Sequence, residues 1–449
     1  MNKKLLKVLS MSMAIVLVFC LGTTSAFAAT SVDYVITNPY ESVSSLIGNL
    51  DNHYKTNLHT HSTYSDATIT LTDMVKEHYA QDFDVLAMAD HGVIGVPWNE
   101  TPTLLPLYQY SNLLYGQAHL TDEEFAQITA GTLNDGRRAE DGGMGCVTGA
   151  IEANYLVAQK NHINGYFMED NRTEGVMGNE GDFETMVAMI DAAGGVSHIN
   201  HPGDWLGSAG NHDIARDPAN VQFFADLYRK YDSCLGMEIY NAFDRPTSGD
   251  RVLWDELLQV VIPEGRNVWG FANNDAHNTD DVDTAFMDFV MPSFSEANVE
   301  TAMTDGTFFA VTRYISGERL GDAHEYPQVT CISVNEAADT ITIIGTNCKE
   351  IRWIANGDVL RTETKEVDGM MTSTIYLREH ADDISCYVRF ELQGEGGITA
   401  SQAFVCDDGN MGDLVNRGPM AGPNVDIVAL IRSILKFLLR SANSLLGIA

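Results

Sequence analysis

The sequence NLHTHSTYSD, residues 57–66, follows a short stretch with strand-like alternation and places His59 and His61 one residue apart. Residues at i and i+2 of a strand lie on the same face, so both imidazole rings can point into one site. A carboxylate ends the segment, and Asp and His recur together downstream in ADH (89–91) and DAH (275–277). If these segments converge in the fold, the sequence predicts a metal site.

Short apolar runs alternate with amphipathic stretches from about residue 52 to residue 317. Alternating strands and helices indicate a parallel sheet, and the number of strand candidates favours an α/β barrel. Strands are expected at Tyr54–His59, Asp84–Asp90, Val147–Glu152, Ile163–Phe167, Gly195–Asn200, Gly236–Tyr240 and Asn267–Asn274. Helices are expected at Thr70–Gln81, Asp182–Ala193, Ala219–Tyr231 and Gly249–Val261. Val93–Met144 breaks the alternation, and we expect a long excursion that covers the active face.

The candidate ligands lie at or near the C-terminal ends of the expected strands. In a parallel barrel these ends form one face, where active sites are found, so residues far apart in sequence can meet there. The residues placed in this way are His59, His61, His91, Glu152, His198, Asn200, His201, Glu238, Asp275 and His277.

Imidazole and carboxylate side chains together suit Zn, Mn or Fe rather than Ca or Mg, which prefer oxygen ligands. A carboxylate such as Glu152 could bridge two ions about 3.5–4 Å apart that share a hydroxide. Because bound metals lower the pKa of water, no catalytic side chain beyond the metal ligands is required.

Five separated pieces of the chain, taken in order, resemble the PHP (polymerase and histidinol phosphatase) domain. They are NLHTHSTYSD, LAMADHG (86–92), Glu152, GGVSHINHP (194–202) and NDAHN (274–278). The resemblance covers about residues 52–317. It implies a distorted (β/α)7 barrel, similar to a TIM barrel, and a metal-dependent phosphoesterase with two or three divalent ions.

The resemblance also assigns ligands. It implies that His59, His61, Glu152 and Asp275 hold one ion, that Glu152 and His201 hold a second, and that Asp66, His91 and His277 hold a third or grip the phosphate. Glu238 departs from the pattern, because several members have a histidine ligand near this position. We expect Glu238 to be a ligand or an outer-layer group, His198 to be a polar neighbour rather than a ligand, and Asp90 to orient an imidazole.

The sequence therefore predicts a hydrolase that cleaves a small phosphate ester through a metal-bridged hydroxide. Two alternatives stay open: a metal-dependent hydrolase of carboxylic or carbamate esters, and a non-catalytic surface protein that binds through its C-terminal region. The net charge of −35 argues against nucleic acid as a partner, and the oligomeric state is not predicted.

Residues 1–29 have the features of a signal peptide. Lys3, Lys4 and Lys7 precede a short apolar core, and Ala26-Phe27-Ala28 matches a small-x-small cleavage site. We expect an exported protein that is secreted or associated with the cell envelope. None of the cysteines forms a C-x-x-C pair, and the last four could form up to two disulfides or stay free.

The residue pattern of the C-terminal part differs from that of the preceding region. Residues 326–406 alternate in the manner of strands with Asn-Gly, Asp-Gly and Gly-Gly turns, which predicts a small antiparallel β-sandwich after a barrel domain at 30–320. A linker is expected at 407–423 and an amphipathic helix at 424–449. Arg432, Lys436 and Arg440 share one face of that helix, which favours contact with a membrane surface or docking on protein.

Overall fold

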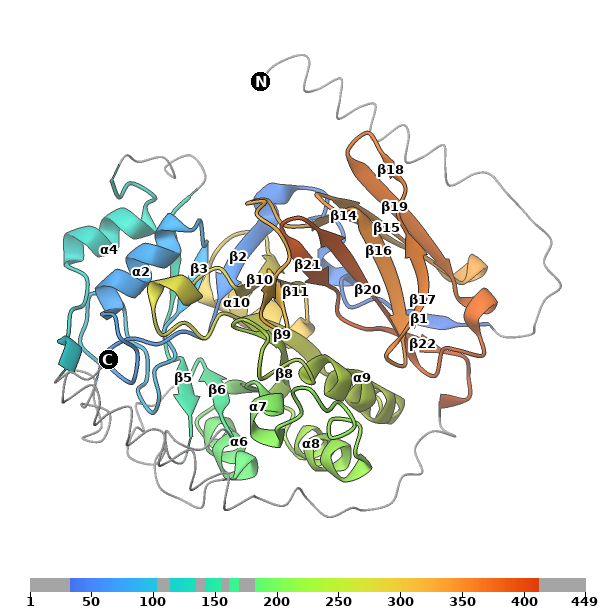
Figure 1. Ribbon diagram of the computed structural model, residues 1–449, viewed down its shortest axis with the longest axis horizontal. Coiled ribbons are helices and arrows are strands. Elements are labelled where there is room, and N and C mark those ends of the chain that lie inside the picture. Colours follow the sequence, from blue (N-terminus) through green and yellow to red (C-terminus); the bar gives the residue numbers. More distant parts are fainter. Residues whose placement is uncertain (1–32, 103–113, 135–141, 155–160, 169–181, 412–449) are drawn as a thin grey trace. The chain divides into compact units, whose positions relative to one another are not determined.

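The strands that carry the predicted ligands form two neighbouring sheets. In the computed structural model, which describes residues 33–102, 114–134, 142–154, 161–168 and 182–411, β2 (His53–Asn57), β3 (Val85–Ala87) and β4 (Gly145–Val147) run parallel. The second sheet has the order β5 (Ile151–Ala153), β6 (Ile163–Tyr166), β7 (Val196–Ile199), β8 (Cys234–Asn241) and β9 (Trp269–Asn273) (Figure 1). The expected α/β character is therefore present.

Two features of the strand prediction are wrong. The strand expected at Val147–Glu152 is split into β4 and β5, with Gly149 between them at a φ of +71°, which favours glycine. In addition, β6 runs antiparallel to both β5 and β7, whereas all strands were expected to be parallel. The connection from β5 to β6 is shorter than the dozen or so residues that a parallel crossover needs.

Isolated bridges join the two sheets where the predicted ligands lie. Thr60, beyond the end of β2, pairs with Ala276 beyond β9, and His91 pairs with Glu152. The strand ends from both sheets therefore meet at one edge. Closure into a complete barrel stays a prediction.

The expected helices are confirmed, and their N-caps explain where they begin. They are α2 (Leu71–Ala80), α6 (Phe183–Ala192), α8 (Pro218–Lys230) and α9 (Asp250–Val261). Thr70 and Asp182 accept hydrogen bonds from the backbone N–H groups of the first turns of α2 and α6. Two further helices are α7 (Pro202–Leu206) and α10 (Glu296–Asp305). No helix in the described ranges is long and apolar enough to span a membrane.

The excursion at Val93–Met144 is described only in part. It contains α4 (Asp122–Thr129), which begins with a capping box formed by Thr121 and Glu124. Residues 103–113 and 135–141 lie outside the described ranges. Its predicted position over the active face stays a prediction.

The C-terminal region is antiparallel, as expected. One sheet has the order β14 (Gln328–Asn335), β15 (Thr340–Thr346), β19 (Met370–Tyr376) and β18 (Glu366–Val367). The other strands are β16 (Glu350–Ala355), β17 (Asp358–Glu363), β20 (Tyr387–Gly394), β21 (Gly397–Ala400) and β22 (Phe404–Asp407). The indole Nε1 of Trp353 donates to Ser373 Oγ at 2.9 Å and so links β16 to β19. A discrete β-sandwich domain stays a prediction.

One sheet runs through both parts of the chain. Strand β10 (Ala285–Val290) pairs with β2 and with β11 (Phe308–Thr312), and β11 pairs with β21. β1 (Val35–Thr37) pairs with β22, and a short hairpin is formed by β12 (Tyr314–Ile315) and β13 (Glu318–Arg319). Buried Arg389 of β20 also pairs with Asp255 of α9 at 2.8 Å. The strands that carry the ligands are thus braced by the C-terminal region.

Several predictions concern residues beyond the described ranges. The signal peptide at 1–29 and the helix at 424–449 lie outside them, as does the linker at 407–423 beyond residue 411. All six described cysteines are free thiols: Cys146, Cys234, Cys331, Cys348, Cys386 and Cys406.

Candidate metal centre

The eight residues predicted as metal ligands come together in one site. The two sheets direct the ends of β2, β3, β5, β7 and β9 to the same edge, as the bridges at Thr60 and His91 show. Nitrogen and oxygen atoms from these strand ends form three overlapping groups. They are His59, His61, Glu152 and Asp275; then His61, Asp66, His91 and His277; then His91, Glu152 and His162.

The first group brings four residues with ligating atoms close enough together to hold one ion. His59 Nε2 lies 3.2 Å from His61 Nε2, 3.3 Å from Glu152 Oε1 and 3.2 Å from Asp275 Oδ1. His61 Nε2 lies 3.2 Å from Glu152 Oε2 and 3.0 Å from Asp275 Oδ1. Four ligands at about 2.0 Å from a zinc ion would be about 3.3 Å from one another. These donor atoms therefore fit a divalent ion at their centre.

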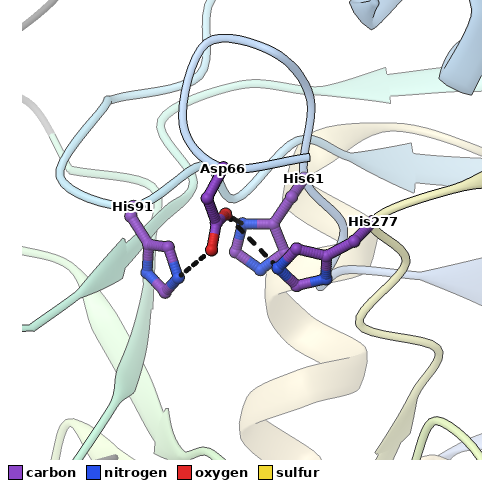
Figure 2. A group of neighbouring side chains, drawn as sticks. All are labelled: His61, Asp66, His91 and His277. Carbon is purple, nitrogen blue, oxygen red and sulfur yellow. Dashed lines mark ion pairs between the residues drawn. The ribbon is translucent and has the colours of Figure 1, made fainter. Parts of the chain in front are cut away.

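The second group surrounds the carboxylate of Asp66. Figure 2 shows Asp66 with His91 on one side and the rings of His61 and His277 on the other. Asp66 oxygens lie 3.5 Å from His91 Nε2, 3.3 Å from His277 Nε2 and 3.8 Å from His61 Nδ1. His277 remains about one-third exposed, so the site opens to solvent on this side.

The third group contains a residue that the sequence did not single out. His162 Nδ1 lies 2.9 Å from Glu152 Oε1, and its ring centroid lies 5.1 Å from that of His201. His201 Nε2 in turn lies 3.4 Å from Glu152 Oε1, which agrees with its predicted position beside that carboxylate. Because β6 is antiparallel, its N-terminal end lies at the site edge, and His162 directly precedes it. The short β5–β6 connection was the sequence signal for this reversal.

Glu238 lies behind His59 and not among the converging donors. Its oxygens accept hydrogen bonds from His59 Nδ1 at 2.8 Å and from the His201 backbone N–H at 3.1 Å. The side-chain amides of Asn241 and Asn273 donate to it as well, each at 3.0 Å. With all these bonds made to protein, Glu238 is placed to hold the His59 ring with Nε2 directed inward.

Asp90 and His198 also occupy supporting positions. Asp90 accepts from the Ser62 backbone N–H at 2.7 Å and from Ser65 Oγ at 2.6 Å, and Ser65 Oγ lies 3.3 Å from His61 Nδ1. Asp90 therefore acts on His61 through a serine rather than directly. His198 Nε2 shares a hydrogen bond with Tyr166 Oη at 2.9 Å, and burial lowers the pKa of this histidine to about 4. His198 thus lies beside Tyr166 and outside the three donor groups of the described residues.

The electrostatics of the site call for positive charge. Four carboxylates, those of Asp66, Glu152, Glu238 and Asp275, lie in the site, and an unpaired buried carboxylate is strongly unfavourable. Burial lowers the pKa of His201, but its bond to Glu152 and the charge of Asp275 outweigh burial and raise it to about 9. Burial likewise lowers the pKa of His277, yet the charge of Asp66 raises it to about 10. Protons on these rings would neutralise the carboxylates, and divalent ions could replace them.

Two of the predicted ligands are among the thirteen described residues other than glycine that have a positive φ. Asp275 has a φ of +47° and His201 a φ of +27°, a region that residues other than glycine rarely adopt. Strain of this kind persists where the surrounding structure enforces it, and it is common at functional sites. The observation supports a functional role for both positions.

Comparisons with known proteins give similarities of fold only. No protein-family model and no curated protein sequence matches the chain. A solved structure described as "a two-domain protein containing predicted PHP-like metal-dependent phosphoesterase" from Bacteroides vulgatus is 14% identical, with a TM-score of 0.40, and covers 84% of this chain and 100% of its own. A lesion-specific endonuclease from Pyrococcus furiosus is 12% identical, with a TM-score of 0.33, over 56% of each chain.

A third similar structure is an amidohydrolase from Chromobacterium violaceum with bound sulfate and no metal. It is 13% identical, with a TM-score of 0.28, and covers 49% of this chain and 87% of its own. Because the identities and TM-scores are low, these similarities carry no information on the function of this chain.

Proposed function

We propose that this chain is a metal-dependent phosphoesterase that hydrolyses a small phosphate ester. The observation that carries the proposal is the sharing of donors among the three groups: Glu152 and His91 each belong to two groups, and so does His61. A shared carboxylate is the feature that holds two ions close together in phosphoesterases with paired metals.

The donor groups, together with the contact of His201 with Glu152, suggest an assignment of residues to ions. His59, His61, Glu152 and Asp275 would hold one ion, and Glu152 with His162 and His201 would hold a second. Asp66, His91 and His277, with His61, would hold a third or would face the phosphate. The mixture of imidazole and carboxylate suits Zn, Mn or Fe. When bound, such ions polarise the phosphoryl oxygens and lower the pKa of a coordinated water.

The remaining chemistry belongs to the chain itself. His277 is the most exposed imidazole of the site, and its Nδ1 is fixed by the backbone carbonyl of Asp275 at 2.9 Å. Where this group faces the phosphate rather than an ion, Nε2 of His277, 3.3 Å from Asp66 Oδ1, would carry the proton that a leaving alcohol needs. Glu238 and the Asp90–Ser65 pair hold His59 and His61 in orientation, so the rings need not reorganise during the reaction.

A test of the proposal compares purified protein loaded with Mn²⁺ or Zn²⁺ on a panel of phosphate monoesters and diesters. Wild type is expected to hydrolyse at least one class, and His59→Ala and Asp275→Asn are expected to lose at least about 100-fold in kcat/KM. His380→Ala, in the C-terminal region, is a control that should keep full activity. Full activity in either ligand variant would refute the proposal.

One observation favours a second candidate, the hydrolysis of carboxylic or carbamate esters. Among the described residues, Asp66, Glu152, Glu238 and Asp275 form ion pairs with histidines, and no such pair to Lys or Arg is found. A dianionic phosphate would then have to be bound by ions and imidazoles alone, whereas a neutral ester would need less positive charge. A panel of carboxylic and carbamate esters, assayed alongside the phosphate esters, separates the two candidate functions. A purified protein with less than one ion per chain would instead revive a non-catalytic binding role.

We also propose, from the sequence, that residues 1–29 direct export and that residues 424–449 contact a membrane surface. Cell fractionation of full-length and 1–29-deleted protein tests the first. Sedimentation with anionic vesicles, with and without 424–449, tests the second.

The isolated bridges at Thr60 and His91 support closure of the two sheets into a barrel.

A further inference from the structure

His78 is a buried histidine of α2 that lies outside the metal centre but beside two strands that enter it. It is fully buried and packs edge-on against Phe83, with ring centroids 4.8 Å apart. His78 belongs to none of the motifs described above. Its contacts lead directly to the segments that carry His59, His61 and Asp275.

The hydrogen bonds of His78 define its tautomer. Nδ1 lies 2.9 Å from the backbone carbonyl of Met74, which can only accept, so Nδ1 carries the proton. Nε2 faces two side-chain amide groups, Asn274 Nδ2 at 2.9 Å and Asn57 Nδ2 at 3.3 Å. Because amide nitrogens only donate, Nε2 must be the acceptor. Burial lowers the pKa of His78 to about 4, which agrees with a neutral ring.

The two asparagines connect the ends of β2 and β9. Asn57 Oδ1 accepts from the Asn274 backbone N–H at 3.1 Å, and Asn57 Nδ2 also donates to the carbonyl of His59 at 3.2 Å. Asn274 Oδ1 accepts from the Ala276 backbone N–H at 3.1 Å, across the strained Asp275. Together, Asn57, Asn274 and His78 form a hydrogen-bonded seam between the two strand ends. Every side-chain amide in this seam has a partner, and His78 Nε2 accepts from both asparagines.

Backbone contacts continue the same seam into the site. The Asp275 N–H donates to the carbonyl of His59 at 3.0 Å, and the His61 N–H donates to the carbonyl of Ala276 at 3.0 Å. The separation of the His59, His61 and Asp275 donor atoms therefore depends on how these two strand ends are held together. A displacement well under 1 Å would alter metal-ligand distances that tolerate about 0.2 Å.

We propose that His78 is a positioning residue that fixes the metal-ligand spacing between the β2 and β9 strand ends by accepting hydrogen bonds from Asn57 and Asn274. This inference rests on the proposed function, because it assumes that the first donor group holds an ion. Loss of the acceptor removes the bond made by the buried Asn274 Nδ2 and one of the two bonds made by Asn57 Nδ2, and the seam then relaxes. Partners in this outer layer typically change metal affinity by about 10- to 100-fold.

The test measures Zn²⁺ affinity of metal-free protein by competition with a chromophoric chelator, alongside urea unfolding in EDTA. His78→Leu is expected to bind Zn²⁺ about 10- to 100-fold more weakly. The matched control is His53→Leu. His53 begins β2, the strand that ends at Asn57, and its Nδ1 pairs with buried Asp288 at 2.9 Å. That control should lose stability while it keeps wild-type Zn²⁺ affinity.

A pair of polar substitutions provides the test if His78→Leu does not fold. Glutamine places its amide near the position of the histidine Nε2, and asparagine places its amide near Nδ1. His78→Gln should retain most of the Zn²⁺ affinity, whereas His78→Asn should lose it, and the Co²⁺ absorption spectrum should change only in the second. Equal affinities for the two variants would overturn the proposal, as would equal losses in His78→Leu and His53→Leu. Absence of Zn²⁺ binding in wild type would overturn the proposed function instead.

Discussion

Replacement of Glu152 by Gln should disrupt the metal centre more than any other single change. The side chain is almost fully buried, and five imidazole nitrogens lie 2.9–3.4 Å from its two oxygens. Glutamine has the same size but no charge, so both donor groups that share Glu152 lose an anionic ligand. Loss of a residue that only orients a metal ligand lowers metal affinity by about 10- to 100-fold. Loss of a direct ligand should therefore lower metal affinity by more than about 100-fold, or about 2.8 kcal/mol.

The same variant should also destabilise the metal-free protein. Without metal, the buried carboxylate of Glu152 is neutralised by protonated imidazoles, and removal of one partner from a buried ion pair costs about 3–5 kcal/mol. Metal content by elemental analysis and Zn²⁺ affinity by competition report the first effect. Urea unfolding in EDTA reports the second.

Glu238→Gln is the matched control for Glu152→Gln. It changes a second buried glutamate of the same site, but one that contacts His59 Nδ1 and backbone or amide N–H groups rather than the converging donor atoms. It should keep its ions with affinity reduced by about 10- to 100-fold. If Glu152→Gln retains the wild-type number of ions at unchanged affinity, or if Glu238→Gln loses more than Glu152→Gln, the reasoning is refuted.

Four further outcomes are expected. Because the pKa of His201 is raised to about 9 in the metal-free protein, Zn²⁺ must displace the proton of this histidine. Zn²⁺ affinity should therefore rise about tenfold per pH unit between pH 7 and 9 for each proton released. Calorimetry in several buffers measures the proton release, and pH-independent binding would contradict it. The raised pKa also stabilises the metal-free fold below the unfolded value of about 6.5, and this contribution should be lost as pH rises through about 9. Arg389→Met should lower the free energy of unfolding by about 3–5 kcal/mol, because buried Asp255 loses its ion-pair partner and keeps the hydrogen bond from Tyr387, while Zn²⁺ affinity stays the same. EDTA should lower the Tm and added Zn²⁺ restore it, and an unchanged Tm would argue against bound metal.

The sequence predicted the principal donors because each belongs to a local pattern. His59 and His61 alternate at a strand end, and Asp275 and His277 do the same, so spacing alone places both members of each pair on one side. The structure brings these pairs within hydrogen-bond distance, with His61 Nε2 and Asp275 Oδ1 3.0 Å apart. The helices were equally local, since capping residues such as Thr70 and Asp182 mark where they begin.

Other residues of the site depend on how strands are oriented relative to one another. His162 enters the centre because β6 is antiparallel, which brings the residue before the strand, rather than after it, to the site edge. Glu238 was left as either a ligand or a supporting group. Its place behind His59 follows from the register of β8 with β9, which sets Asn273 and Asn241 around its carboxylate.

The sequence determined which residue types are available and which lie together at a strand end, because those properties follow from composition and from the period of two along a strand. The tertiary structure alone decided which strand ends meet and at what separation. Apart from the contact between His59 and His61, the distances of 3.0–3.3 Å within the first donor group join these histidines to Glu152 and Asp275, about 90 and more than 200 positions away. The seam joins Asn274 to Asn57 and His78, 217 and 196 positions away. No local pattern encodes such contacts, since they depend on the packing of α2 against two strands and on the direction in which each strand runs.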